Sequence, residues 1–159
     1  MSFKDIFQEE YSVVNNAHAR VNLIGEHTDY TGGYVLPSLL NFKTNIQISQ
    51  NYKKQYQVYS DNFNEQINFT DFVRSENIDW IDYVKGCLFV FYDENKHIPN
   101  THLNIFISSS IPMGRGISSS SALCVAILKT LNDFFKTQYS EKHIAILAKK
   151  VERNYICVS

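Results

Sequence analysis

A glycine-containing turn that runs straight into a helical pattern constrains the fold of this chain most. Residues 110–122 read Ser-Ile-Pro-Met-Gly-Arg-Gly-Ile-Ser-Ser-Ser-Ser-Ala. Gly114 and Gly116 allow a sharp backbone turn that approaches a ligand without interference from a Cβ atom. The serines supply hydroxyl groups and a helix N-cap at the end where unpaired N–H groups and the positive end of the dipole lie. This combination predicts an anion site, and phosphate is the usual anion.

The same segment excludes two common phosphate-binding motifs. It has neither the Gly-Lys-Ser/Thr of a Walker loop nor the G-x-G-x-x-G of a dinucleotide-binding fold. We therefore expect the chain to hold nucleotide phosphates with a loop of a different kind. The structural alternative is that the serines serve only as an N-cap.

The composition indicates an ordinary globular protein with a single domain over residues 1–159. Hydrophobic residues make up 44% and charged residues 19% of the chain. The net charge of −1 gives no field that would attract nucleic acid or an anionic membrane surface. Apolar runs are shorter than a membrane span and the N-terminus has no signal-peptide pattern, so we expect a cytoplasmic protein. Cys87, Cys124 and Cys157 are widely spaced in apolar patterns, which predicts buried reduced thiols.

The order of strand and helix patterns favours an α+β fold. Polar and apolar residues that alternate predict strands in the segments 13–24, 34–40, 45–49, 55–60, 66–69 and 103–107. We expect the segments 45–49 and 55–60 to pair as a hairpin. Helical spacing of apolar residues predicts helices over 3–11, 80–92, 117–135 and 140–155. Because strands come first and helices later, the pattern argues for α+β.

A second constellation of polar residues follows the first strand, between residues 20 and 33. Glu26, His27 and Asp29 offer acceptors and a donor within a tight loop, which suits a ligand with several hydroxyl groups, such as a sugar. The alternative is a solvated loop that only connects two strands. A metal site from these three residues is a further alternative, although adjacent positions seldom converge on one ion.

Four segments together resemble the galactokinases, which are members of the wider GHMP kinase family. Residues 20–33 are similar to the N-terminal galactokinase signature, and residues 112–122 to the family's phosphate loop. Residues 80–86, Trp-Ile-Asp-Tyr-Val-Lys-Gly, are similar to the segment whose Trp stacks on adenine. Residues 151–155 are similar to a helix with a magnesium-binding Glu. The resemblance covers the chain from residue 17 to its last residue. It implies the N-terminal domain of the GHMP kinase fold (ribosomal protein S5 domain 2-like), with a mixed sheet packed by helices and without a C-terminal domain.

The resemblance implies that the sugar is held by the first polar loop. In that family Glu26, His27, Thr28 and Asp29 would bind the substrate and fix which hydroxyl faces ATP. Arg20 would also contact substrate and act in catalysis, by neutralising charge near the transferred phosphoryl group. The implied reaction is ATP-dependent phosphorylation of the anomeric hydroxyl of galactose, which gives galactose 1-phosphate. Kinases for N-acetylgalactosamine or arabinose, and a non-catalytic sugar- and ATP-sensing relative, are the alternatives.

The resemblance also implies the cofactors ATP and Mg²⁺ and the residues that bind them. Trp80 would stack on adenine. The triphosphate would be wrapped by Gly114, Arg115, Gly116, Ile117, Ser118, Ser119 and Ser120. Ser120 and Glu152 would hold Mg²⁺, which prefers hard oxygen ligands. The implied partners are a small-molecule sugar and ATP, with no nucleic acid and no membrane, and the implied full-length protein is a monomer.

Structural alternatives accompany two of these residues. Trp80 could be simple core filler. Glu152 has Lys149, Lys150 and Arg153 nearby in sequence, so a surface ion pair competes with a metal-binding role.

The chain departs from the family pattern at several places. The general-base Asp of a Gly-x-x-Asp turn would lie beyond residue 159, so we expect the 159-residue chain alone to be catalytically inactive. Ala19 stands where the family has Gly, which would crowd a bend if its φ is positive. Arg115 stands where a small residue is common, and Cys157 stands where a Gly is expected.

Overall fold

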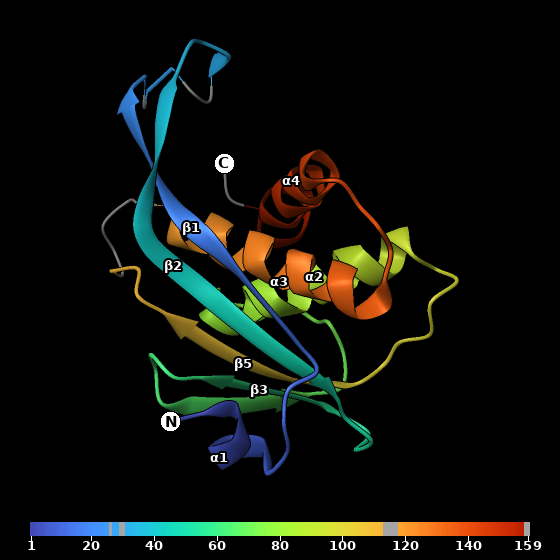
Figure 1. Cartoon of the computed structure of the whole chain (residues 1–159). Helices are drawn as coiled ribbons and strands as arrows, with labels where there is room; N and C mark the ends of the chain where they lie inside the picture. The colour runs from blue at the N-terminus through green and yellow to red at the C-terminus, as the bar shows by residue number, and fades with distance from the viewer. Residues whose placement is uncertain (26, 29–30, 113–117, 158–159) are drawn as a thin grey trace.

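One face of a mixed β-sheet is covered by helices (Figure 1). The structure, a computed structural model, describes residues 1–25, 27–28, 31–112 and 118–157. The elements, in chain order, are α1 (Phe3–Phe7), β1 (Val13–Ile24), β2 (Leu36–Gln50), β3 (Tyr56–Ser60), β4 (Glu65–Phe69), α2 (Trp80–Glu94), β5 (Leu103–Ser109), α3 (Ser119–Phe135), α4 (Glu141–Lys150) and a π-helical turn, η2 (Val151–Ile156). The α+β class and the mixed sheet packed by helices, both expected from the sequence, are confirmed.

Strand β5 occupies the centre of the sheet, whose order is β1-β2-β5-β3-β4. It runs antiparallel to β2 and parallel to β3, with Ile105 opposite both Ile48 and Val58. The expected hairpin of residues 45–49 with 55–60 is therefore wrong, because β5 lies between these two segments. The physical reason is burial: the first five residues of β5 are buried on both faces, so this strand takes the position with a partner on each side.

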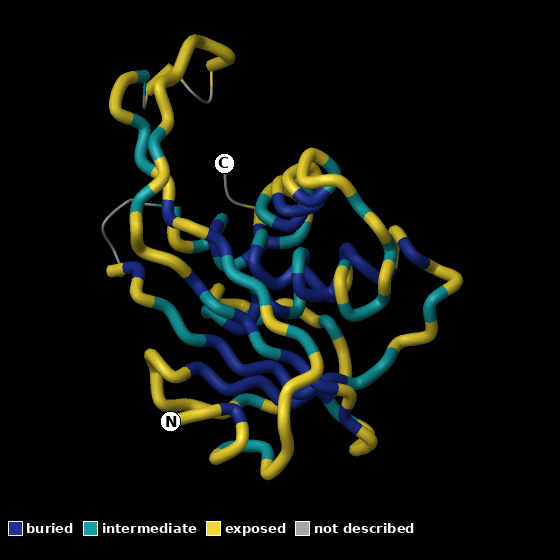
Figure 2. The backbone as a smooth tube through the Cα atoms, in the orientation of Figure 1, coloured by how far each residue is buried: buried dark blue, intermediate teal, exposed yellow. Residues whose placement is uncertain are grey.

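Strands β1 and β2 form a long antiparallel hairpin that extends past the rest of the sheet (Figure 1). Strand β2 joins the two segments 34–40 and 45–49 that the sequence suggested were separate. Only Thr44–Gln50 pairs with β5, so the earlier part of β2 has β1 as its partner strand among the described residues. Pro37 lies in that earlier part, where a residue without a backbone donor is tolerated. This end of the hairpin is mostly exposed (Figure 2).

Helix α3 lies against β1 and β2 and contacts both α2 and α4. Small residues such as Ala122 and Ala126 on α3 are buried, and Leu88 of α2 packs in the same core. Asp79 and Asp82 form a capping box that fixes the beginning of α2. No described helix combines the length and the apolar character that crossing a bilayer requires.

The N-terminal segment packs on the opposite face of the sheet from α3. Phe3 is buried against Tyr59 and Phe106, which belong to β3 and β5. Helix α1 ends at Phe7 rather than continuing to residue 11, because Gln8 adopts a left-handed conformation with φ 59°. The expected helix of residues 3–11 is therefore shorter than predicted.

The last described residues change from an α-helix to a π-helical turn. We expected one helix to continue to Tyr155, but α4 ends at Lys150 and η2 follows. Cys157 caps η2 with φ 65°, a conformation that favours glycine, in agreement with the Gly expected there. Its side chain is exposed, so the expectation of three buried thiols holds only for Cys87 and Cys124.

Candidate active site

An open pocket of about 470 Å³ lies where the N-terminal ends of α2 and α3 meet the ends of β3 and β5. We call it the Trp80 pocket. Its lining includes the side chains of Asn62, Phe63, Trp80, Tyr83, Ser109 and Ser120. Aromatic side chains at one part and hydroxyl groups at another give the pocket an apolar region and a polar region. Pockets that bind small molecules commonly have this division.

Trp80, the first residue of α2 and the single tryptophan of the chain, is half-buried. Its ring stacks on that of Phe63, with 5.8 Å between centroids and 16° between planes. The indole N–H donates to Glu65 Oε2 at 3.1 Å. Because one contact fixes the ring plane and the other fixes its rotation, Trp80 is a fixed aromatic wall of the pocket, and it packs against the edge of the core as well.

The hydroxyl groups of Ser120 and Ser121 both donate to Glu152 Oε1, each at 3.0 Å. The described contacts of the Glu152 carboxylate are these hydrogen bonds from serines, and not the surface ion pair considered as an alternative. Lys150 instead faces Asp93 and Glu94, at 3.9 Å from each. Helix α3 and the turn η2 are thus joined through one carboxylate, which binds a serine that lines the pocket.

Ser118 does not cap α3 in the expected way. Its backbone has φ 56° and ψ 42° instead of the extended conformation usual at an N-cap, and its side chain makes no capping hydrogen bond. Its carbonyl accepts from Ala122 N–H at 3.0 Å. A serine does stand at the N-cap position as expected, but the expected hydrogen bond from its side chain is absent. The expected phosphate-loop residues Gly114, Arg115, Gly116 and Ile117 lie outside the described residues.

The oxygens around Glu152 have the chemistry that Mg²⁺ requires. A carboxylate oxygen and the hydroxyl groups of Ser120 and Ser121 lie within hydrogen-bond distance of one another. Mg²⁺ binds hard oxygen atoms and commonly has one or two protein carboxylates, with phosphate and water completing its shell. No group of three or more His, Cys, Asp or Glu suited to a metal occurs in the described part of the chain. The carboxylate and the two hydroxyl groups are hard oxygen donors of the kind that Mg²⁺ accepts together with phosphate and water.

Tyr83 lies on α2, one turn after Trp80, and lines the same pocket. Burial raises the pKa of its hydroxyl, and the nearby Cys124 and Glu152 raise that pKa further. The hydroxyl therefore keeps its proton near neutral pH and can donate a hydrogen bond to an anion. Cys124 is itself buried and belongs to α3.

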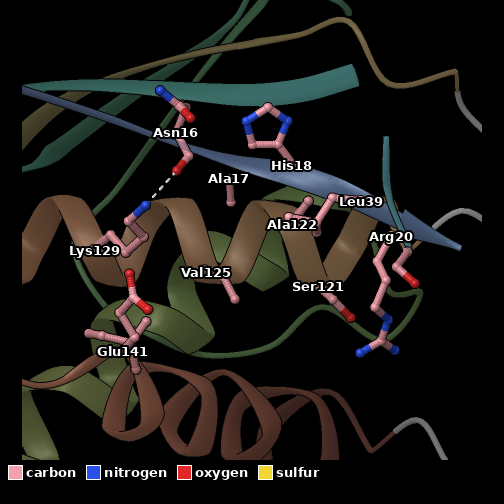
Figure 3. A pocket seen from close by; sticks show the side chains of 12 residues that line it. Asn16, Ala17, His18, Arg20, Leu39, Ser121, Ala122, Val125, Lys129 and Glu141 are labelled. Carbon is pink, nitrogen blue, oxygen red and sulfur yellow. Dashed lines mark hydrogen bonds between the residues drawn. The ribbon is translucent and has the colours of Figure 1, made fainter. Parts of the chain in front are cut away.

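A second open pocket, of about 370 Å³, lies between β1, α3 and α4. We call it the Arg20 pocket. Figure 3 shows Arg20 and Ser121 at one end of it, and Lys129 and Glu141 at the other. Lys129 Nζ donates to the Asn16 carbonyl at 2.9 Å. Because Ser121 lines this pocket and Ser120 lines the Trp80 pocket, Glu152 receives one hydroxyl from each pocket.

The expected sugar-binding residues do not all gather beside Arg20. Glu26 and Asp29 lie outside the described residues. His27 and Thr28 are exposed near the end of the β1–β2 hairpin, and neither lines the Arg20 pocket. Thr28 Oγ1 lies 3.0 Å from the carbonyl oxygens of Gly25 and Tyr34, so this hydroxyl closes the loop on itself.

The crowding expected at Ala19 does not occur. Ala19 is fully buried in β1, its φ is not positive, and the strand instead has an irregularity in register between His18 and Arg20. A register shift of this kind re-aims the following side chain. This register shift directly precedes Arg20, which lies at one end of the Arg20 pocket.

Sequence reasoning missed the wall of the Trp80 pocket that the sheet provides. Asn62 and Ser109 are joined by two hydrogen bonds, Asn62 Nδ2 to the Ser109 carbonyl (2.7 Å) and Ser109 N–H to Asn62 Oδ1 (2.8 Å). Phe63 follows Asn62 in the turn after β3. These residues form no sequence motif, since β3 and β5 become neighbours only in the folded sheet. Ser121 was missed as well, although it directly follows the predicted Ser120.

Two family models match the chain: the GHMP kinases N terminal domain over residues 82–159, and the galactokinase galactose-binding signature over residues 1–50. The galactokinase of Pyrococcus furiosus is 42% identical over 139 residues, which is 87% of this chain and 38% of the relative. The galactokinase of Clostridium acetobutylicum is 35% identical, over 99% of this chain and 41% of the relative. The chain thus spans about two-fifths of the length of these curated relatives.

Solved structures agree with the sequence matches. A Lactococcus lactis galactokinase complexed with galactose superposes with a TM-score of 0.89 at 29% identity, over 99% of this chain and 42% of that one. A mevalonate kinase superposes with a TM-score of 0.81 at 21% identity, over 89% of this chain and 46% of that one, which shows a shared fold. From both family models and these relatives together, the chain belongs to the GHMP kinase family, and within that family it is similar to the galactokinases.

Proposed function

We propose that this chain supplies the ATP-binding and galactose-binding parts of a cytoplasmic galactokinase, which transfers the terminal phosphoryl group of ATP to the anomeric hydroxyl of galactose. The observation that carries the proposal is the position of Glu152. Its carboxylate accepts hydroxyl groups from Ser120 in the Trp80 pocket and from Ser121 in the Arg20 pocket. Phosphoryl transfer requires the donor and the acceptor to come together, and Glu152 links a wall of the Trp80 pocket to the end of the Arg20 pocket where Arg20 lies.

On the nucleotide side, each group has a role that its surroundings support. The indole of Trp80, held by Phe63 and Glu65, offers a flat surface for adenine. The N-terminus of α3, with Ser119 and Ser120, offers N–H and hydroxyl donors for phosphate oxygens. Ser120 and Glu152 would hold Mg²⁺, which supplies charge neutralisation at the phosphates when it is bound. We also propose, from the sequence motif, that residues 114–117 bind the phosphates.

On the sugar side, Arg20 lies at the end of its pocket that Ser121 shares. A guanidinium in this position would stabilise negative charge on the phosphoryl group during transfer. We assign galactose as the substrate because residues 1–50 match a galactose-binding signature. Glu26, His27, Thr28 and Asp29 remain the proposed sugar-binding residues. Such catalysis consists chiefly of positioning and charge neutralisation.

The single tryptophan provides a direct test. ATP that stacks on Trp80 should quench the tryptophan fluorescence of the chain, and the quenching should saturate and become tighter when Mg²⁺ is added. Galactose should bind in a calorimetric titration, and glucose should bind less tightly. Fluorescence that does not respond to ATP in the folded chain would overturn the ATP-binding part of the proposal. Equal heats for galactose and glucose would overturn the assignment of the sugar.

A further inference from the structure

The middle of α2 approaches η2 more closely than any residue with a side chain would allow. A Cβ atom at Gly86 would lie 2.7 Å from Tyr155 Cδ1 and 2.9 Å from Val151 Cγ1. A glycine inside a helix costs about 1 kcal/mol relative to alanine. The close packing of the Tyr155 ring on the bare backbone of α2 offsets this cost.

Tyr155 is also anchored beyond the helix. Its hydroxyl donates to the carbonyl of Phe72, in the segment between β4 and α2. Arg74, two residues further along that segment, donates from Nη1 to the Ile156 carbonyl at 2.7 Å. The same segment leads directly to Trp80, the first residue of α2. The turn η2 is therefore tied both to the middle of α2 and to the segment that positions the Trp80 ring.

Glu152 lies on η2, three residues before Tyr155. A π-helical turn has wider hydrogen-bond spacing than an α-helix, and such turns are frequent at functional sites because they re-aim side chains. The two serine hydroxyl groups fix one oxygen of the carboxylate, but the backbone that carries Glu152 depends on the contacts of η2 itself. Tyr155 is the residue of that turn that contacts both α2, at Gly86, and residues 70–79, through the Phe72 carbonyl.

We propose that Tyr155, seated on Gly86, is a positioning residue that holds Glu152 in the orientation required for Mg²⁺–ATP and couples this carboxylate to the Trp80 wall. This inference rests on the proposed function and adds a residue to which neither the sequence motifs nor the comparisons give a role. Tyr155 does not line the Trp80 pocket, so it acts through Glu152.

The protonation state of Tyr155 suits this role. Burial raises the pKa of its hydroxyl to about 12, with the Asp82 carboxylate adding to the shift and Arg74 opposing it. The hydroxyl therefore remains a donor to the Phe72 carbonyl throughout the neutral range. The hydrogen bond that anchors η2 does not depend on pH between 6 and 9, where the binding experiments below are carried out.

The test measures ATP affinity with and without Mg²⁺, from the fluorescence of Trp80, and compares the ratio of the two dissociation constants. In Tyr155→Phe the ring stays on Gly86 but the anchor to Phe72 is lost. We expect the enhancement by Mg²⁺ to fall about 10-fold, the lower end of the loss found when partners that orient metal ligands are removed. The affinity for ATP without metal should stay within about twofold. Gly86→Ala, which displaces the whole ring, should lower the enhancement further.

Tyr139→Phe is the matched control. Its hydroxyl also makes one hydrogen bond, to Asn95 Oδ1 at 2.7 Å, and burial likewise raises its pKa. Loss of that bond should lower stability to a similar extent and leave the Mg²⁺ enhancement unchanged. The inference is overturned if Tyr155→Phe keeps the full enhancement, or if Tyr139→Phe loses as much. An unsubstituted chain that does not bind ATP would instead overturn the proposed function, and this inference with it.

Discussion

The Trp80 pocket and the free end of the β1–β2 hairpin both carry residues that the sequence marks for ligand binding, but they are built in opposite ways. The pocket is walled by α2, α3, β3 and β5, and all of these elements pack in the core. At the hairpin end, β1 and β2 pair with each other, and the backbone there is mostly coloured as exposed (Figure 2). Its exposed apolar residues include Tyr34 (99%) and Leu39 (71%). One site is held by the core of the domain, whereas the other is held by local hydrogen bonds.

This difference separates the energies that hold the two sites in place. Burial of a large apolar side chain contributes about 1.5–3 kcal/mol, whereas a hydrogen bond such as that of Thr28 contributes about 0.5–1.5 kcal/mol net. Segments with few buried contacts open at low free-energy cost. We therefore expect the nucleotide site to be lost only with the fold, and the sugar loop to respond to small local changes.

The largest expected effect comes from truncating one leucine in each region. Leu88 on α2 is fully buried, so Leu88→Ala should lower the free energy of unfolding by about 2–5 kcal/mol, because it leaves a cavity in the core that α2 shares with α3. Leu39→Ala on the exposed hairpin should change it by less than about 0.5 kcal/mol. Urea denaturation followed by circular dichroism measures both. Similar losses for the two variants would contradict the comparison.

A smaller effect is expected from the carboxylate that joins the two pockets. Glu152→Gln keeps the size of the side chain but removes its charge. The enhancement of ATP affinity by Mg²⁺ should therefore fall by about 10-fold or more, since loss of a residue that only orients a metal ligand already lowers it by that much. Trp80 fluorescence measures this. Glu94→Gln, on α2 beside Lys150 and His143, is the control and should keep the full enhancement. A Glu152→Gln chain with normal enhancement would remove Glu152 from the proposed metal site.

The comparison also explains what the sequence could predict. The resemblance to the galactokinases singled out Trp80, Ser120 and Glu152, because each belongs to a short segment that is similar to a motif of that family. The α+β class followed from the order of strand and helix patterns. Both kinds of prediction use information that is local in the chain.

Local sequence patterns could not predict which strands pair when they lie far apart in the chain. Residues 45–49 and 55–60 looked like neighbours, but the more apolar β5 inserts between them. The contribution of Asn62 and Phe63 to the pocket follows from that insertion, so it was missed for the same reason. The π-helical turn was missed because its wider spacing still places Val151 and Tyr155 in an apolar pattern typical of an α-helix.

The smallest expected effect lies in the loop that Thr28 closes. Thr28→Val keeps the shape of the side chain and removes the hydroxyl that lies 3.0 Å from the carbonyls of Gly25 and Tyr34. A Cβ atom built at Gly25 would lie 2.9 Å from Thr28 Oγ1, so the turn is closely packed around this hydroxyl group. Galactose affinity, measured by calorimetry, should fall about fivefold, equivalent to the about 1 kcal/mol net value of one hydrogen bond.

The same variant should leave the affinity for ATP unchanged, because no wall of the Trp80 pocket comes from residues 24–36. Thr137→Val removes a comparable bond, from Thr137 Oγ1 to Asn132 Oδ1 (2.7 Å), in the connection between α3 and α4, and should change neither affinity. If Thr28→Val weakened ATP binding as much as galactose binding, the two regions would form one cooperative unit, since a local defect in the hairpin would then reach α2. An effect confined to galactose means that the hairpin loop can vary with the sugar while the nucleotide pocket stays fixed.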